Sequence, residues 1–269
     1  MTPEPSPPAP AGAPSSPTGE GSPQRGMVRL PTHPVRLTYV FLVLIGLVFL
    51  AQLASEQFLG SDVVIFYGAK INEFIAQGEV WRLLTAVFIH VNLLHVGFNA
   101  YALFNIGSEV ERFYGSLRFG LLFLLTGIAG SVLSLLFNPS PAVGASGAVF
   151  GLIGAEGVFL YRHRQMFGER GRRSLQNIVV IAVINLVLGL QGGIDNWGHV
   201  GGLLGGLALG WMIGPVWAVQ HTLEPALVPA PAAITLADQH PLTGLRWLGV
   251  LGFGMALTAL IGLALILQR

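Results

Sequence analysis

The sequence contains no cysteine and few charged residues. Its 269 residues include 14 Lys or Arg and 13 Asp or Glu, so charged side chains make up 10% of the chain and the net charge is +1. The absence of cysteine excludes disulfides, thiolate metal ligands and a cysteine nucleophile. So small a net charge offers no basic face for nucleic acid. Apolar residues are abundant instead: 52% of the chain is hydrophobic and the mean hydropathy is +0.66, which predicts a protein of the lipid bilayer.

Composition divides the chain into several regions. Residues 1–36 are rich in Pro, Ser, Ala and Gly and cannot bury enough apolar surface to offset the entropy of ordering, so we predict a disordered cytoplasmic tail. Residues 37–219 are predicted to form a six-helix core. A polar cytoplasmic linker is expected at 220–247, and a seventh transmembrane helix with the C-terminus at 248–269. The predicted fold class is an all-α membrane protein, a six-helix bundle with one appended helix.

Seven apolar segments underlie this prediction. A helix needs about 20 residues to cross about 30 Å of hydrocarbon, and most of the segments approach that length. The fourth and fifth have only 16 residues each, and we expect the fourth to begin below the membrane surface, inside protein. That start would place Ser146 within the membrane, at the floor of a cavity. The segments are Leu37–Leu53, Leu83–Ile106, Phe119–Phe137, Ser146–Tyr161, Leu175–Leu190, Trp197–Val219 and Leu248–Leu267.

The basic residues predict an orientation in the membrane. With a cytoplasmic N-terminus, seven crossings leave 11 basic residues inside and only Lys70, Arg82 and Arg269 outside, as the positive-inside rule requires. The basic run 162–173 is interpreted as a topology anchor rather than a binding patch. Ser146 would then open toward the extracytoplasmic side, and the partly apolar loop 55–82 would lie in the outer membrane interface. The expected location is a bacterial inner membrane.

A glycine-rich stretch presents one hydroxyl where a loop becomes a helix. Ser146 lies in Gly144-Ala145-Ser146-Gly147, after a loop broken by prolines. Glycine removes Cβ bulk, so other backbone can come close and Ser146 stays approachable. The motif alone fits the packing of small residues between membrane helices equally well.

The sixth segment supplies a histidine that could act with this serine. A packing seam between the sixth and fourth segments would bring His199 near Ser146, because both lie at the same ends of their segments. A neutral imidazole can take the proton of a hydroxyl during attack, so Ser146 and His199 are candidate nucleophile and general base. The seam is predicted from glycines that recur every four residues, namely Gly198, Gly202, Gly206 and Gly210.

Two further side chains could support the histidine. Phe150, one turn after Ser146, would share its helix face and could stack on the His199 ring, although a plain core role explains it as well. Asp195, four residues before His199, could orient the imidazole. It lies at the watery end of the helix, so a serine–histidine dyad is the simpler interpretation.

The second segment carries polar residues that could stabilise an oxyanion. His95 and Asn99 are four apart, share a helix face and can donate hydrogen bonds alongside the backbone N–H of Ser146. A polar contact between helices is the alternative. On a continuous helix His90 would lie about 140° from His95, so we assign it a structural role outside this cluster. A metal site made of these histidines with His199 is not expected, because no HExxH pattern occurs, and no cofactor is predicted.

The chain resembles the rhomboid family of intramembrane serine proteases from about Leu37 to Val219. The resemblance implies that Ser146 is the nucleophile, His199 the general base, and His95 and Asn99 part of the oxyanion hole. It also implies that the substrates are transmembrane helices, unwound near small residues. The motifs that carry it are Trp81-Arg82; His90, His95 and Asn99; Gly107, Glu111 and Gly115; Gly144-Ala145-Ser146-Gly147; and Gly198-His199-Val200-Gly201-Gly202 with Gly206.

Two positions depart from the family pattern, and other functions remain to be separated. Phe113 stands where some bacterial members have arginine, and Phe150 where some have tyrosine. One alternative is a non-proteolytic relative that binds transmembrane helices, but such relatives typically lack the serine or the histidine. The other is a transporter or channel, for which we would expect internal repeats or broken helices at the midplane.

Overall fold

The computed structural model describes residues 31–190, 192–222 and 233–268, so most of the predicted tail lies outside the described residues. Most of the described chain is helical. In chain order the elements are α1 (Leu37–Leu59), α2 (Val63–Gly68), α3 (Asn72–Ala76), α4 (Arg82–Thr85), the 3₁₀-helix η1 (Ala86–Phe88), α5 (Leu93–Ala102), the π-helix η2 (Leu103–Gly107), α6 (Ser108–Tyr114), α7 (Ser116–Phe137), α8 (Ser146–Arg162), α9 (Arg164–Gly189), α10 (Asn196–Ile213), β1 (Trp217–Thr222), β2 (Ala233–Asp238) and α11 (Gly244–Leu267).

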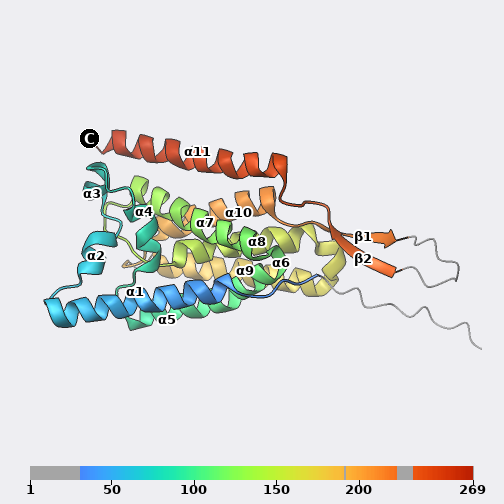
Figure 1. Cartoon of the computed structure of the whole chain (residues 1–269), viewed down its shortest axis with the longest axis horizontal. Coiled ribbons are helices and arrows are strands. Elements are labelled where there is room, and N and C mark those ends of the chain that lie inside the picture. The colour runs from blue at the N-terminus through green and yellow to red at the C-terminus, as the bar shows by residue number, and fades with distance from the viewer. Residues whose placement is uncertain (1–30, 191, 223–232, 269) are drawn as a thin grey trace, which may run out of the picture.

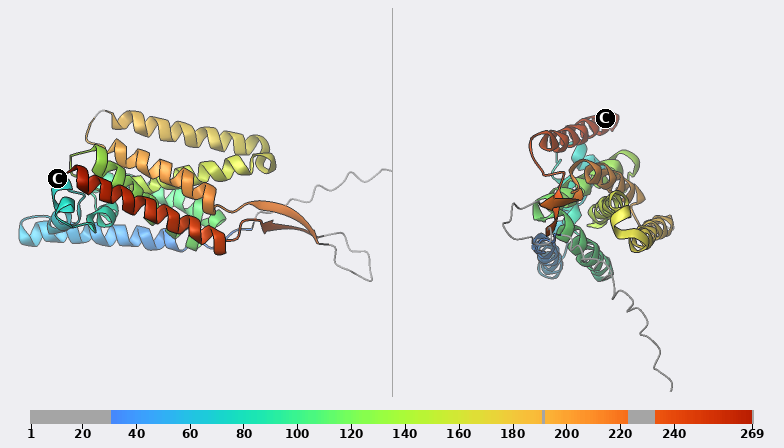
Figure 2. Two further views of the ribbon diagram at one scale, coloured as in Figure 1. Left: turned by 90° about the horizontal axis from the view of Figure 1, so that it is seen from above. Right: turned by 90° about the vertical axis from the view of Figure 1, so that its right-hand side faces the viewer.

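The long helices run side by side as an elongated bundle (Figure 1). One end of the bundle carries α2 and α3 and is called the loop end; the other carries β1 and β2 and is called the hairpin end. Helices α7, α8 and α10 pack against one another in the middle, whereas α1, α9 and α11 lie at the periphery (Figure 2). The apolar window of α7 is 61% buried, against 11% in α9 and 17% in α11, so the peripheral helices leave large apolar surfaces for lipid.

The described helices fit a membrane protein. Four of them, α1, α7, α9 and α11, are long and apolar enough to cross a bilayer, and a fifth span results if the bent pair α4–η1 and α5–α6 counts as one. The central helices α8 and α10 are shorter, at 17 and 18 residues. The prediction of an all-α membrane bundle is confirmed, and the helix predicted for the fourth segment is short, as expected.

The prediction of one continuous helix over Leu83–Ile106 is wrong. The chain bends by 91° between Arg82–Phe88 and Leu93–Tyr114, and His90 lies in the break. The side chain of Gln52 on α1 stabilises the break, because its amide donates to His90 O at 2.9 Å and accepts from His90 N–H at 3.1 Å. Asn92 then caps α5 by accepting from the His95 N–H at 2.8 Å.

Glu111 fixes the start of α1. It is fully buried, and its carboxylate accepts from the backbone N–H groups of Arg36, Leu37 and Thr38 at 2.8–3.0 Å. These are donors that a helix N-terminus otherwise leaves unpaired. Phe113, which departs from the family pattern, stacks on Phe159 of α8 with ring centroids 5.1 Å apart.

The region predicted as a linker, 220–247, contains regular structure at both of its ends. Strands β1 and β2 pair antiparallel in a register that matches Trp217 with Asp238, and α11 begins at Gly244. The strands project from the hairpin end of the bundle (Figure 1). Composition did not reveal the strands, because their pairing depends on contacts with the helices.

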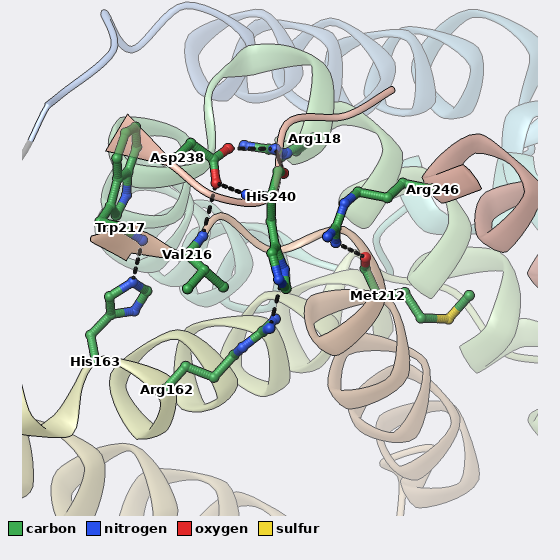
Figure 3. Close-up of polar contacts among 9 residues, drawn as sticks. All are labelled: Arg118, Arg162, His163, Met212, Val216, Trp217, Asp238, His240 and Arg246. Carbon is green, nitrogen blue, oxygen red and sulfur yellow. Dashed lines mark hydrogen bonds and ion pairs between the residues drawn. The ribbon is translucent and has the colours of Figure 1, made fainter. Parts of the chain in front are cut away.

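Those contacts form a polar cluster, the hairpin-end cluster (Figure 3). Asp238 forms an ion pair with Arg118 of α7 at 2.8 Å and accepts from the backbone N–H of Val216 at 2.9 Å. The backbone N–H of Trp217 donates to His163 Nε2, at the junction of α8 and α9, at 2.9 Å. The two-stranded ribbon is thereby attached to the core helices.

Candidate active site

Ser146 is the first residue of α8, and the loop before it takes an unusual path. Gly144 has φ +127°, a conformation that side chains disfavour, and a Cβ on Gly144 would lie 2.7 Å from His95 Nε2. The N–H of Gly144 donates to Ala86 O at 2.9 Å, which holds the loop against η1. Glycine at 144 therefore permits both the turn and the close approach of His95.

A seam of glycine joins α8 to α10 and sets the positions of Ser146 and His199. A Cβ on Gly202 would collide with the carbonyl oxygen of Gly147, and one on Gly206 would collide with that of Gly151. Gly202 and Gly206 of the predicted glycine stripe therefore lie in the contact between α8 and α10. A second face of α10, with Gly201 and Gly205, meets α7 and was not predicted.

The structure brings Ser146 and His199 together across this seam. Ser146 Oγ lies 2.9 Å from His199 Nε2, a hydrogen-bond distance. The Phe150 ring stacks on the His199 ring, with centroids 4.3 Å apart and planes 10° apart. A flat contact of this kind restricts rotation of the imidazole.

Among the described residues, no hydrogen bond joins Asp195 to the imidazole of His199. Its Oδ1 accepts from the Gly198 N–H at 3.3 Å and from Asn138 Nδ2 at 2.9 Å, so Asp195 caps the start of α10. The Nδ1 atom of His199 is buried and has no hydrogen-bond partner among the described residues. Within the described residues the arrangement is therefore a hydrogen-bonded pair of side chains, in which the ring is held by the stacking of Phe150 and not by a third hydrogen-bonding residue.

His95 and Asn99 approach the same loop from α5. A Cβ on Gly144 would lie 3.9 Å from Asn99 Nδ2, close to the 2.7 Å approach of His95 Nε2. The Asn99 amide donates to the His95 carbonyl at 3.0 Å. Both residues therefore flank the segment that leads into Ser146.

The exclusion of His90 from this cluster is wrong. That prediction assumed a continuous helix, but the chain breaks at His90 and its ring lies 5.0 Å from the ring of His95. His90 Nε2 accepts from the Ala145 N–H at 3.4 Å, one residue before Ser146. With Gln52 behind it, His90 supports the start of α8. Gln52 could have been identified from the sequence, because it is a polar residue inside the first apolar segment.

A comparison with protein families matches the part of the chain that contains these residues. The rhomboid domain matches residues 77–216 of the chain, which include the bend, Ser146 and His199. The chain belongs to the rhomboid family. It is an integral membrane protein of helical segments, as the resemblance in the sequence implied.

Several rhomboid proteins are similar to this chain. The rhomboid protease GluP of Bacillus subtilis is 45% identical over 170 residues, which are 63% of this chain and 33% of GluP. Rhomboid-like protease 1 of Toxoplasma gondii is 39% identical over 168 residues, 58% of this chain and 57% of that protein. The chloroplastic RHOMBOID-like protein 9 of Arabidopsis thaliana is 37% identical over 153 residues, 56% of this chain and 35% of that protein. This rhomboid chain thus spans about a third to just over half the length of these relatives.

Two cavities of this rhomboid border the segment that enters α8. One, of about 30 Å³, has Ser146 in its wall together with Lys70, Ser131 and Asp195, and has room for a water molecule. The other, of about 640 Å³, has mostly apolar walls that include Phe66 and residues 141–143. The candidate serine thus has a polar space on one side and an apolar space a few residues away.

Proposed function

We propose that this rhomboid is an intramembrane serine endopeptidase that cleaves transmembrane segments of other proteins with Ser146 and His199. The observation that carries the proposal is the 2.9 Å distance between Ser146 Oγ and His199 Nε2 across a helix seam that only glycine permits. The names of two similar proteins, rhomboid protease GluP and rhomboid-like protease 1, support it.

In the proposed reaction Ser146 Oγ attacks the scissile carbonyl while His199 Nε2 takes its proton. The tetrahedral oxyanion would accept hydrogen bonds from the Ser146 backbone N–H and from the side chains of His95 and Asn99. The imidazolium then protonates the leaving amine as the C–N bond breaks, which leaves an ester on Ser146. A water molecule, deprotonated by His199, hydrolyses the ester. The cavity of about 30 Å³ beside Ser146 is a suitable position for that water.

The apolar pocket suits a substrate that comes from the membrane. It follows the loop segment 141–143, which leads into Ser146, so an extended substrate lying along this segment would bury apolar side chains there. A helix must unwind before its backbone can reach the serine, which favours cleavage near small residues. The proposed partners are therefore transmembrane proteins and the bilayer itself, with no metal or cofactor required.

We further propose that the N-terminus is cytoplasmic and that Ser146 opens to the extracytoplasmic side. The distribution of arginine supports this orientation. The basic run 162–173 begins at the hairpin end, where Arg162 and His163 contact His240 and Trp217, whereas Ser146 shares a cavity wall with Lys70 at the loop end. A bacterial inner membrane is the proposed location. Relatives named chloroplastic and mitochondrial show that other membranes also hold rhomboid proteins.

The test is cleavage of defined substrates by the purified protein. A panel of single-span membrane proteins is incubated in proteoliposomes with the wild type and with Ser146→Ala, and the fragments are measured by mass spectrometry. We expect a cut within or beside the span in the wild type only. Binding of spans without any cleavage would instead support a non-proteolytic rhomboid, and equal cleavage by Ser146→Ala would refute the assignment of the serine.

A further inference from the structure

Lys70 is the only lysine among the 14 basic residues of the chain, and it is buried. It lies between α2 and α3 with 1% of its surface exposed. Its ammonium group donates to Asn72 Oδ1 at 3.0 Å and to the carbonyl oxygens of Asn138 and Ser140, each at 2.8 Å. An ammonium has three N–H donors, so every donor is used. A buried charge is costly, and these bonds offset part of that cost.

The backbone of Lys70 pairs with the segment that leads into Ser146. Its N–H donates to Ala142 O at 3.0 Å, and the Ala142 N–H donates back to Lys70 O at 3.0 Å, which makes an antiparallel bridge. With the two side-chain bonds to Asn138 O and Ser140 O, Lys70 holds this segment at three positions. Ala142 is only four residues before Ser146.

The same contacts continue to the helix that carries His199. Asn138, whose carbonyl binds the ammonium, donates its side-chain amide to Asp195 Oδ1 at 2.9 Å. Asp195 caps α10 through the N–H of Gly198, one residue before His199. Lys70 and Asp195 also line the small cavity that borders Ser146. One chain of contacts therefore connects Lys70 to the segments of both candidate catalytic residues.

We propose that Lys70 is a positioning residue for the Ser146–His199 pair. Its ammonium holds the loop that enters α8 and, through Asn138 and Asp195, keeps the first turn of α10 at the matching position. This inference rests on the proposed protease function. Lys70 itself does not touch the reacting atoms; it acts through the backbone segments that carry them.

The charge of Lys70 gives the proposal a distinct readout. Burial lowers the pKa of Lys70 from 10.5 to about 8, against the opposing attraction of Asp195 and Glu73. The neighbouring cation, Arg82, donates to Ala69 O at 3.0 Å and pairs with Glu79. Lys70 is thus the group that loses a proton, and a neutral amine donates two hydrogen bonds instead of three.

Stability and activity should then respond to pH in opposite directions. Between pH 8 and 10.5 the unfolded lysine is protonated while the folded one is neutral, so this group makes the folded state more stable as the pH rises. Turnover, by contrast, falls as the third hydrogen bond is lost. A decrease in kcat above about pH 8 without loss of folded protein is therefore the signature of positioning by the ammonium.

The experiment compares the wild type with Lys70→Met and Lys70→Arg from pH 6 to pH 10 in proteoliposomes. Cleavage of one transmembrane substrate gives kcat and KM, and thermal unfolding reports the fold. We expect Lys70→Met to lose about 10- to 100-fold in kcat with little change in KM, since small displacements of reacting groups have effects of this size. Lys70→Arg should recover part of kcat and show no decrease above about pH 8.

Three results would overturn the proposal: wild-type kcat in Lys70→Met, the same alkaline decrease in Lys70→Arg as in the wild type, or no decrease in the wild type. If Lys70→Met does not fold, Asn138→Ala decides, because it keeps the carbonyl acceptor of Lys70. It removes the side-chain bond to Asp195 and the bond that Asn138 Oδ1 accepts from the Ser140 N–H. A kcat of Asn138→Ala reduced several-fold supports the chain of contacts from Lys70 to α10, and an unchanged kcat refutes it. A wild type that neither cleaves nor reacts with a fluorophosphonate would reject the protease function, and this inference with it.

Discussion

The two ends of the bundle both bury charged side chains, and two of these, Arg118 and Lys70, have different partners. At the hairpin end Arg118 meets the carboxylate of Asp238 at 2.8 Å, and that carboxylate also accepts backbone N–H groups (Figure 3). At the loop end the ammonium of Lys70 meets only neutral oxygens. Close by, His199 contacts Ser146 through one ring nitrogen, and its other ring nitrogen has no partner within the described chain.

This difference separates a structural cluster from a reactive one. A buried ion pair with its hydrogen bonds in place fixes one conformation of the chain. A hydroxyl beside an imidazole and a small cavity can instead react with another molecule. Buried polar atoms without a hydrogen-bond partner, and ionisable groups in unusual surroundings, occur most often at such functional sites. We therefore expect substitutions at the loop end to change turnover, and substitutions at the hairpin end to change stability.

The largest effect is expected for His199→Ala. Without the imidazole, Ser146 has no base for its proton, so kcat should fall on the order of 10⁴-fold or more. His163→Ala is the matched control, because His163 is a buried histidine at the hairpin end that binds backbone. Cleavage assays normalised to folded protein measure both. Equal losses of kcat in His199→Ala and His163→Ala would contradict the division into a reactive loop end and a structural hairpin end.

The next largest effect is expected for Asn99→Ala. Loss of one oxyanion donor should reduce kcat on the order of 10²- to 10³-fold while KM changes little. Asn105→Ala is the matched control: its amide also donates to the carbonyl four residues earlier, at 2.7 Å, but its side chain is exposed. Steady-state kinetics on one substrate decides. Unchanged kcat in Asn99→Ala would limit Asn99 to a helix contact.

The helix seam gives a test at the level of stability. In Gly202→Ala the new Cβ would collide with the Gly147 carbonyl, so we expect a loss of about 2 to 4 kcal/mol in stability and a further fall in kcat. Gly252→Ala on α11 has no neighbour within 4 Å and should be neutral or stabilising by up to about 1 kcal/mol. Thermal and denaturant unfolding in micelles compares them. Equal stability of both variants would show that the seam tolerates separation.

The smallest effect is expected at the hairpin end. Burial alone would raise the pKa of Asp238, but hydrogen bonds from the Val216 N–H, Arg118 and the His240 N–H lower it below its ordinary value of 3.8. A folded pKa below the unfolded one gives stabilisation that is present above pH 3.8 and lost as the pH falls through the folded value. The protection of the β1 amides, relative to their intrinsic exchange rates at each pH, should therefore fall at acidic pH.

Asp238→Asn should reproduce this loosening at neutral pH and reduce stability by about 1 to 2 kcal/mol, with turnover unchanged. Glu169→Gln is its control, because the pair of Glu169 with Arg172 is exposed and should contribute little to stability. Protection of β1 that is the same at pH 3 and pH 7 would contradict the role of the ion pair.

Much of the bundle could be predicted from the sequence because the membrane imposes length and composition. The starts or ends of α1, α7, α8 and α11 lie within a few residues of the apolar segments. The residue patterns also predicted the meeting of the fourth and sixth segments, since glycines every four residues leave a face on which backbones approach. Those regularities are local, and a single sequence displays them.

The features that could not be predicted depend on distant partners. The bend at His90 has no proline, and it is stabilised by Gln52 from another helix, so the periodicity of 83–106 still resembled one helix. The pairing of β1 and β2 is held by Arg118 and His163 of the core. Asn92 was the one local signal of the bend, as a helix cap in the middle of an apolar segment.

The most direct test of the account is covalent labelling of the serine. The purified protein in lipid is treated with a fluorophosphonate probe, and the adduct is located by peptide mass spectrometry in the wild type, His199→Ala and His163→Ala. We predict an adduct on Ser146 in the wild type and in His163→Ala, and little or none in His199→Ala. An adduct of equal yield in His199→Ala, or a probe that leaves Ser146 unmodified in the active wild type, would contradict a nucleophile activated by that histidine.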